Sequence, residues 1–197
     1  ASAAQLEKVL TIVKEDTSRK FVVVSAPGKR SSDDIKVTDL LIAYYNAYLN
    51  NEKTTAAIEK IVARYEAILD ELNMSKEILA DITQAIQRLA TLPKENNPHL
   101  LDAFLASGED NNAKLVAAFF QQRGLNACYK SPLDLGLIVT DEPGNARILP
   151  SSLSKINAFK ATEEILVIPG FFGFTESGEI CTFSRGGSDI TGSIVAA

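Results

Sequence analysis

The chain has 197 residues, of which 46% are hydrophobic and 23% charged, and this composition is typical of a globular protein rather than a disordered one. Its formal net charge of −5 disfavours nucleic-acid binding, since that function depends on clustered lysines and arginines. No apolar run approaches the roughly 20 residues that cross a bilayer, and the first residues lack the charged-then-apolar pattern of a signal peptide. We therefore expect a cytoplasmic protein with no membrane partner.

The two cysteines, Cys128 and Cys181, are about fifty positions apart and have no second cysteine or histidine at ligand spacing. We expect free thiols rather than a disulfide. We predict no metal site from these residues. Asp33, Asp34 and Asp39 are irregularly spaced, and a solvated or capping role is favoured for them over a metal site.

The first third of the chain predicts a helix, a strand and a second helix. Apolar residues at helical spacing predict a helix that starts at residue 2 or 3. The run "FVVVSAPGK" (21–29) is typical of a strand that is buried on both faces of a parallel sheet. The helical pattern resumes at about Val37.

Two apolar stripes between residues 54 and 92 predict a helical hairpin with "NMS" at its turn. Such a pair of helices can be a partner-binding arm, although stripes at this spacing more often pack in a core. The following stretch, 100–124, predicts two helical segments interrupted at Ser107 and Gly108.

The last third predicts mostly strands. Short apolar or alternating runs at 135–140, 146–149 and 163–170 fit strands, and 173–183 fits a hairpin that turns at Ser177 and Gly178. A final helix follows. The order of helices and strands indicates a layered α/β domain.

The stretch "CTFSRGGSDITGS" (181–193) places an arginine, two glycines and a carboxylate where a strand gives way to a helix. A helix N-terminus that follows glycines exposes free backbone N–H groups, so it suits an anion. The same pattern also fits a plain turn with Ser188 or Asp189 as the N-cap. The two common nucleotide-binding fingerprints, Walker A and G-x-G-x-x-G, are absent.

Several segments together resemble the aspartate kinases of the amino-acid kinase family. The similar segments are "VVVSAPGK" with "VTDLL", "ASGED", "GLIVTDEPGNARILP" and "IPGFFGFTESGEICTFSRGGSDITGS". The resemblance implies a three-layer αβα sandwich with a mostly parallel sheet, into which the helical hairpin is inserted. It also implies transfer of the γ-phosphoryl of ATP, with Mg²⁺, to the side-chain carboxylate of L-aspartate. The product, 4-phospho-L-aspartate, starts the biosynthesis of lysine, threonine and methionine.

The resemblance also implies the residues of the site. The Arg of the family's R-G-G-S-D motif matches Arg185 and is expected to hold the α-carboxylate of aspartate, and Glu109 is expected to face its ammonium group. Asp189 is the implied catalytic residue, and Gly186 and Gly187 are assigned to the cofactor. The implied substrate-binding residues are Ser25, Thr38, Glu109, Phe171, Arg185 and Ser188.

Other features of the family do not occur in the 197 residues. We expect the chain to be part of an amino-acid kinase catalytic domain, without the family's first strand with its K-[FY]-G-G-[ST]-S motif, its nucleotide-binding part and its regulatory ACT domains. We expect the parent protein to form homo-oligomers and this piece to be inactive alone. Two alternatives remain open: another amino-acid kinase with a different acid substrate, and a non-catalytic interaction module. His99, the only histidine, is expected to face solvent.

Overall fold

The computed structural model describes residues 3–184 and 186–196. Residues 1 and 2 lie outside this part of the chain, so of the two starts expected for the first helix, residue 2 lies outside the described residues and residue 3 is the first of α1. The elements, in chain order, are α1 (Ala3–Glu15), β1 (Phe21–Val24), α2 (Val37–Leu49), α3 (Thr55–Glu71), α4 (Glu77–Leu89), α5 (Leu100–Gln122), β2 (Ala127–Tyr129), α6 (Pro132–Leu135), α7 (Ser151–Asn157), β3 (Ile165–Pro169), β4 (Phe172–Phe174), β5 (Ile180–Thr182) and α8 (Gly187–Ala196).

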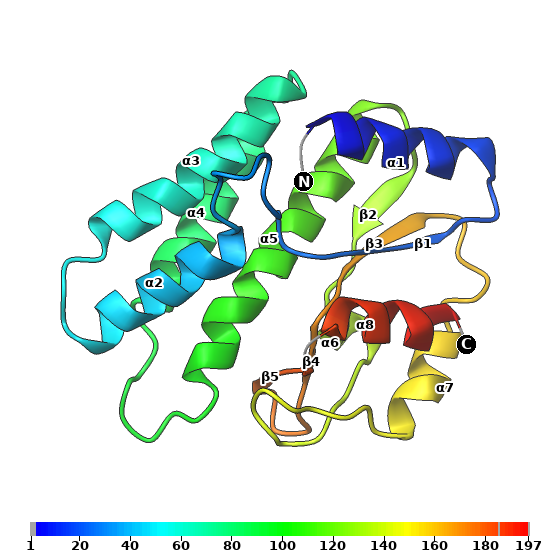
Figure 1. The fold of residues 1–197 in the computed structure, drawn as a ribbon. Helices are drawn as coiled ribbons and strands as arrows, with labels where there is room; N and C mark the ends of the chain where they lie inside the picture. The colour runs from blue at the N-terminus through cyan, green and yellow to red at the C-terminus, as the bar shows by residue number, and fades with distance from the viewer. Residues whose placement is uncertain (1–2, 185, 197) are drawn as a thin grey trace.

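A parallel sheet lies between two layers of helices (Figure 1). Its strand order is β1-β3-β2, and β3 pairs in parallel with both neighbours. A separate hairpin is formed by β4 and β5, which pair antiparallel as the sequence predicted. The α/β fold with a parallel sheet and helices on both faces agrees with the expected fold class.

The central strand β3 supplies both hydrophobic cores, because successive side chains of a strand point to opposite faces. Ile165 and Val167 pack in the core formed with α1 to α5. Leu166 and Ile168 pack in the second core, with residues near α6, α7 and α8. All five residues of β3 are buried, as a continuous apolar run in a parallel sheet predicts. β1 is only half-buried, because it lies at an edge of the described sheet.

α3 and α4 form the predicted helical hairpin, and its apolar stripes are core rather than a free surface. Ile61, Ile68, Ile82 and Ile86 are fully buried in the first core. The hairpin also packs beside α2 and α5 (Figure 1). A partner-binding arm built on these stripes therefore finds no support, since the stripes are already covered.

The predicted interruption at Ser107 and Gly108 is wrong, because α5 continues through both residues. Gly108 is needed for close approach rather than for a break. A Cβ added there would lie 2.9 Å from the Cβ of Ala26 and 3.1 Å from the Cδ1 of Leu41. The buried hydroxyl of Tyr65 also donates a hydrogen bond to the Gly108 carbonyl oxygen, at 2.9 Å.

The strands predicted at 135–140 and 146–149 are also wrong. Only isolated bridges join Ile138 to Phe174 and Val139 to Ile148. Leu135, Leu137, Val139 and Ala146 are buried in the second core, and half-buried Ile148 packs against it. The apolar pattern of these runs therefore reflects mainly burial rather than strand pairing. In turn, β2 was not predicted, because three residues are too few to show an alternating pattern.

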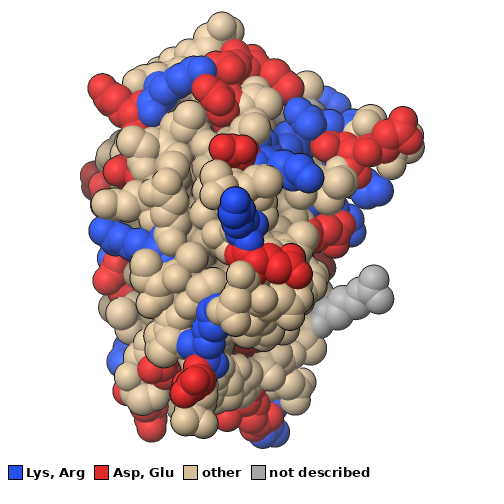
Figure 2. Space-filling view, turned by 90° about the vertical axis from the view of Figure 1, so that its left-hand side faces the viewer, with Lys and Arg blue, Asp and Glu red and all other residues tan. Residues whose placement is uncertain are grey.

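Three expectations drawn from composition can be compared with the described residues. Within them, no helix combines the length and the apolar character that a bilayer span requires. Cys128 is half-buried and Cys181 is buried, and both are free thiols as expected. On the face shown in Figure 2, basic and acidic side chains are intermixed, and no large basic area is visible there.

Candidate functional site

Two segments predicted to bind substrate begin next to each other, at the carboxyl ends of β1 and β3. Val24, the last residue of β1, is paired with Pro169, the last of β3. The backbone N–H of Gly170 donates to the Val24 carbonyl oxygen at 2.9 Å. Ser25 and Gly170 therefore leave the sheet side by side. The carboxyl edge of a parallel sheet is where α/β proteins usually bind their ligands.

The first turn of α8 lies against the segment that follows β3. A Cβ added at Gly170 would lie 2.8 Å from the Cα of Ser188, so only glycine allows this approach. The backbone N–H of Phe171 donates to the Thr191 hydroxyl at 3.1 Å, which ties the segment to the next turn of α8. Ser188 is thereby brought to the edge where β1 and β3 end.

Phe171 packs closely against Gly187, the second glycine of the pair. Phe171 has φ +78°, a left-handed conformation that costs free energy for a bulky residue. A Cβ at Gly187 would lie 2.7 Å from the Phe171 ring and 2.9 Å from the Cβ of Phe183. Gly186 has φ +84° and open space beside it. Asp189 follows in the first turn of α8, where its side chain is exposed.

Glu109 and Asn112, one turn apart on α5, approach the same edge from the helical layer. The Asn112 side-chain amide donates to the Ser25 carbonyl oxygen at 2.7 Å. Glu109 is 7% exposed and Asn112 is 3% exposed. Glu109 Oε2 and Asn112 Oδ1 are buried without a hydrogen-bond partner in the described part of the chain. Two buried acceptors without donors are costly, and a ligand with N–H groups would satisfy them.

The pKa of Glu109 is raised to about 7. Burial is the main cause, because it disfavours the charged carboxylate, and hydrogen bonding from the backbone of Ala26 opposes it. The carboxyl group is therefore poised between its two protonation states near neutral pH. A cationic ligand group beside it would favour the ionised form.

The structure brings most of the predicted substrate residues to one region. Ser25 is exposed just beyond β1, and Thr38 is half-buried in the first turn of α2. Val37, next to Thr38, donates its N–H to the Pro27 carbonyl oxygen, at 3.1 Å, so the start of α2 lies beside the loop after β1. Arg185, the predicted carboxylate-binding residue, lies outside the described residues.

Sequence reasoning missed Asn112 and Asp102. Buried Asp102 accepts hydrogen bonds from the backbone N–H groups of Thr182 at 2.7 Å and Gly144 at 2.9 Å. It thereby ties β5, which leads into the R-G-G-S-D stretch, to α5. The available signal was the occurrence of polar residues within a largely apolar helix, since buried polar residues usually have a specific partner.

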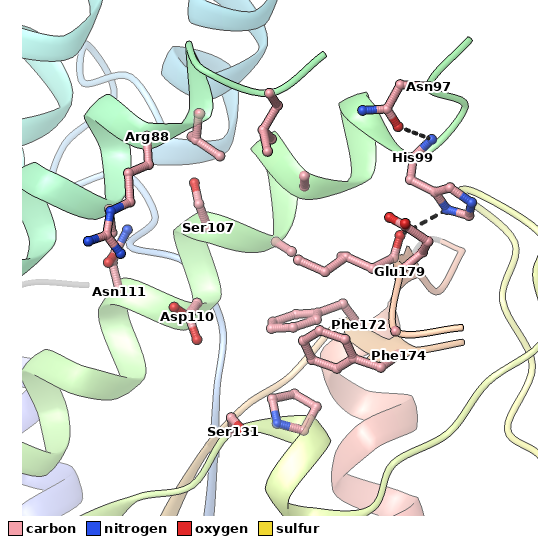
Figure 3. A pocket seen from close by; sticks show the side chains of 18 of the residues that line it. Arg88, Asn97, His99, Ser107, Asp110, Asn111, Ser131, Phe172, Phe174 and Glu179 are labelled. Carbon is pink, nitrogen blue, oxygen red and sulfur yellow. Dashed lines mark hydrogen bonds between the residues drawn. The ribbon is translucent and has the colours of Figure 1, made fainter. Parts of the chain in front are cut away.

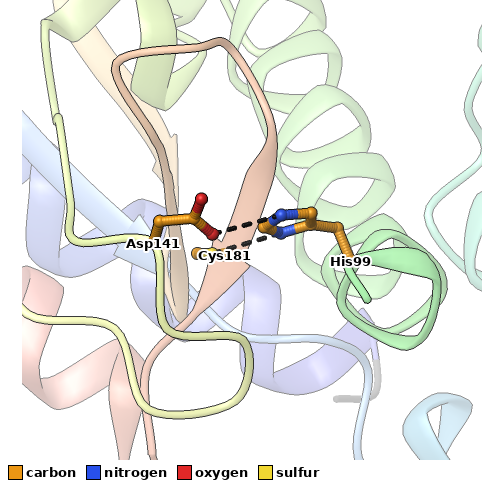
Figure 4. Close-up of side chains that lie close together, drawn as sticks. All are labelled: His99, Asp141 and Cys181. Atoms are coloured by element: carbon orange, nitrogen blue, oxygen red, sulfur yellow. Dashed lines mark hydrogen bonds and ion pairs between the residues drawn. The ribbon is translucent and has the colours of Figure 1, made fainter. Parts of the chain in front are cut away.

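His99 is 8% exposed, so the expectation of a solvent-facing histidine is wrong. Its Nε2 lies 3.2 Å from Asp141 Oδ1 and its Nδ1 lies 3.4 Å from Cys181 Sγ (Figure 4). The three side chains offer atoms that could hold a metal ion. Burial raises the pKa of the Cys181 thiol to about 11, so the thiol is neutral in the metal-free protein. The contacts of His99 with Asp141 and Cys181 tie the start of α5 to β5 and to the loop after Val139.

Comparisons with known proteins agree on one family. Residues 1–197 match the model of the amino acid kinase family. The chain is 49% identical over 196 residues to Aspartokinase 3 of Bacillus subtilis (strain 168), which covers all of this chain and 43% of that protein. It is 34% identical over 97 residues to Aspartokinase 2 of the same organism, which covers 49% of this chain and 24% of that protein.

Solved structures give the same result. The aspartate kinase of Clostridium acetobutylicum superposes with a TM-score of 0.80 at 30% identity, covering all of this chain and 42% of that chain. Aspartokinase III of E. coli, in complex with aspartate and ADP, superposes with a TM-score of 0.77 at 23% identity, covering all of this chain and 44% of that chain; this match shows the fold alone. The chain thus spans less than half the length of these relatives.

Proposed function

Because the chain belongs to the amino acid kinase family, we propose that it forms the aspartate-binding part of an aspartate kinase. The parent protein would transfer the γ-phosphoryl of ATP to the side-chain carboxylate of L-aspartate and release 4-phospho-L-aspartate. The observation that carries this proposal is the buried Glu109, whose Oε2 has no donor among the described residues. It lies one helical turn from Asn112, which contacts the loop after β1. The names of the relatives favour aspartate over another acid.

L-Aspartate carries two carboxylates and one ammonium group, so its pocket needs groups of both charges placed apart. We assign the ammonium to Glu109, because an ammonium supplies the donors that Glu109 Oε2 and Asn112 Oδ1 lack. We assign the α-carboxylate to Arg185. Neutral donors would come from Ser25, Thr38 and Ser188, and the Phe171 ring would form a wall of the pocket.

Phosphoryl transfer depends mainly on positioning and on neutralising charge on the moving group. In this proposal the N-terminus of α8, with Gly186 and Gly187, directs backbone N–H groups toward the phosphoryl group. Asp189 in the same turn is the proposed catalytic residue. ATP would bring Mg²⁺, and we assign no metal ligand among these residues, since Mg²⁺ often binds largely through substrate phosphates and water.

The activity proposed for the parent also needs parts that these 197 residues do not supply. The K-[FY]-G-G-[ST]-S motif of the family does not occur in the sequence. We therefore expect these 197 residues to bind aspartate without phosphorylating it. An assay of ADP release tests this expectation, and aspartate-dependent turnover by the 197 residues would overturn it. We further propose that the parent is a cytoplasmic homo-oligomer.

The assignment of Arg185 is tested by steady-state kinetics of the parent protein. Arg185→Ala is expected to raise the KM for aspartate by an amount equivalent to about 2–4 kcal/mol, because one charge-paired contact is lost. The KM for ATP should change far less. A matched control is Arg147→Ala, because Arg147 is an exposed residue that is paired with Glu142 and has no role in the proposed site. An unchanged KM for aspartate would remove Arg185 from the proposed site.

A further inference from the structure

A cavity of about 440 Å³ lies between α4, α5 and the hairpin of β4 and β5 (Figure 3). Its volume falls within the range of small-molecule sites. None of the described residues assigned above to aspartate or ATP lines it. Phe171 belongs to the proposed aspartate site and does not line the cavity, whereas Phe172, the first residue of β4, does. The cavity is therefore a second site.

One end of the cavity carries a free cation and a free acceptor. In Figure 3, the side chains of Arg88 and Asn111 lie at the same end. Arg88 is exposed in the last turn of α4 and makes no ion pair with any residue that the structure describes. Asn111 is 1% exposed, and its Oδ1 has no donor among those residues. The nearby Asp110 is already engaged, by the Lys114 ammonium at 2.7 Å and by the Tyr129 hydroxyl.

The rest of the cavity is lined mainly by hydrocarbon. The Phe172 and Phe174 rings lie with centroids 6.0 Å apart and planes at 63°, and they form one wall (Figure 3). Leu89, Leu92 and Ile180 also line the cavity. An apolar ligand body would bury its surface here, which is the main source of affinity in such pockets.

We propose that this cavity binds an α-amino acid with an apolar side chain. Such a ligand carries its carboxylate and its ammonium on one carbon, and the cavity offers Arg88 and Asn111 at one end. The carboxylate accepts hydrogen bonds from the Arg88 guanidinium, which is suited to bidentate recognition. The ammonium donates to Asn111 Oδ1, and the apolar side chain packs on Phe172 and Phe174.

The position of the cavity gives a bound amino acid a route to the aspartate site. The hairpin that forms one wall starts directly after Phe171 and ends just before the stretch 184–189. A ligand on Phe172, Phe174 and Ile180 would therefore contact the segment that joins two parts of the aspartate site. The binding proposal itself uses none of the aspartate-site residues, so it does not depend on the proposed function.

Titration calorimetry of the protein with L-leucine and L-phenylalanine tests the proposal. We expect saturable binding of at least one of them. L-Leucinamide lacks the carboxylate and 4-methylpentanoate lacks the ammonium, so each should bind roughly tenfold or more weakly than L-leucine. Absence of saturable binding for both amino acids would overturn the proposal. Equal binding of L-leucine and L-leucinamide would do the same, because the carboxylate would then have no role.

Variants locate the binding site. Arg88→Ala should weaken amino-acid binding by roughly tenfold or more, and Arg88→Lys should restore part of it because the charge is kept. Arg147→Ala is the matched control, since Arg147 is exposed and does not line the cavity. Amide shifts in ¹H–¹⁵N spectra should include Phe172 and Phe174. Unchanged binding by Arg88→Ala, or shifts that omit both phenylalanines, would refute the site. L-Aspartate binding, measured in parallel, is expected to be unaffected by Arg88→Ala.

Discussion

Glu109 is the residue on which the proposed chemistry depends. A buried carboxylate is costly unless it is paired, and its neighbours supply only part of what it needs, since Oε2 has no donor in the described residues. The raised pKa of Glu109 reflects this cost of burying the charged carboxylate. A substrate ammonium would offset this desolvation cost by pairing with the carboxylate. Relief of the cost would therefore contribute to the free energy of aspartate binding.

The first prediction concerns the pH dependence of aspartate binding. Glu109 has a pKa of about 7 in the ligand-free protein, and the ammonium favours its ionised form. Affinity for L-aspartate should therefore increase from about pH 6 to about pH 8, by at most about tenfold per pH unit. Titration calorimetry at several pH values measures it. In Glu109→Gln the affinity should be lower and nearly independent of pH, and a steep pH dependence in that variant would exclude Glu109 as its source.

The same carboxyl group predicts how stability changes with pH. Its pKa rises from 4.5 to about 7 on folding, so the folded state binds the proton more tightly than the unfolded state. The contribution of Glu109 is fully present below about pH 4.5 and is lost as pH rises through about 7. The loss is of the order of 3 kcal/mol.

Urea unfolding of the ligand-free protein and of Glu109→Gln should separate this effect from other groups. The variant should lack the loss of stability that Glu109 causes as the pH rises. The free energy of unfolding of Glu109→Gln, relative to that of the unaltered 197 residues, should therefore increase between about pH 5 and about pH 8. Parallel curves for the two proteins over this range would contradict the prediction.

At the scale of elements, α5 shows both what the sequence could predict and what it could not. Its apolar spacing correctly predicts helix on both sides of Gly108, but the break that the glycine predicts does not occur. The contact that explains this glycine comes from Ala26, more than 80 positions away in the sequence, and local pattern holds no information about it. The predictions of strands at 135–140 and 146–149 are wrong for a similar reason. The apolar pattern there reflects burial by tertiary contacts, which the local sequence does not distinguish from strand pairing.

Replacement of Gly108 tests whether close approach is its role. In Gly108→Ala the new Cβ meets Ala26 and Leu41, and we expect a net loss of about 1–2 kcal/mol in the free energy of unfolding, despite the better helix propensity of alanine. Aspartate binding should also weaken, because Ala26 adjoins Ser25.

Gly192→Ala is the matched control. A Cβ at this helical position of α8 meets nothing within 4 Å, so the variant should gain up to about 1 kcal/mol. Equal gains in both variants would contradict the prediction.

At the scale of the whole molecule, the proposed site is assembled from parts that are distant in sequence. The hydrogen bond from Asn112 to Ser25 joins residues 87 positions apart, and Gly170 brings the segment after β3 against α8. The resemblance to aspartate kinases predicts Ser25, Glu109 and Ser188 as site residues, but the packing around them could not be predicted from composition or periodicity. Asn112, for example, has no motif of its own and is found only from its contact.

A ligand that joins these parts should stabilise the entire fold. L-Aspartate at 100 times its Kd is expected to add about 2.7 kcal/mol to the free energy of unfolding, and thermal denaturation should shift upward by about 5–10 °C. Succinate, which keeps both carboxylates but lacks the ammonium, should give a smaller shift at the same concentration, because it cannot pair with Glu109. In Glu109→Gln the difference between the two ligands should shrink. Equal shifts for aspartate and succinate in the unaltered chain would contradict the assignment of Glu109 to the ammonium, since both ligands would then gain their affinity from the carboxylates alone.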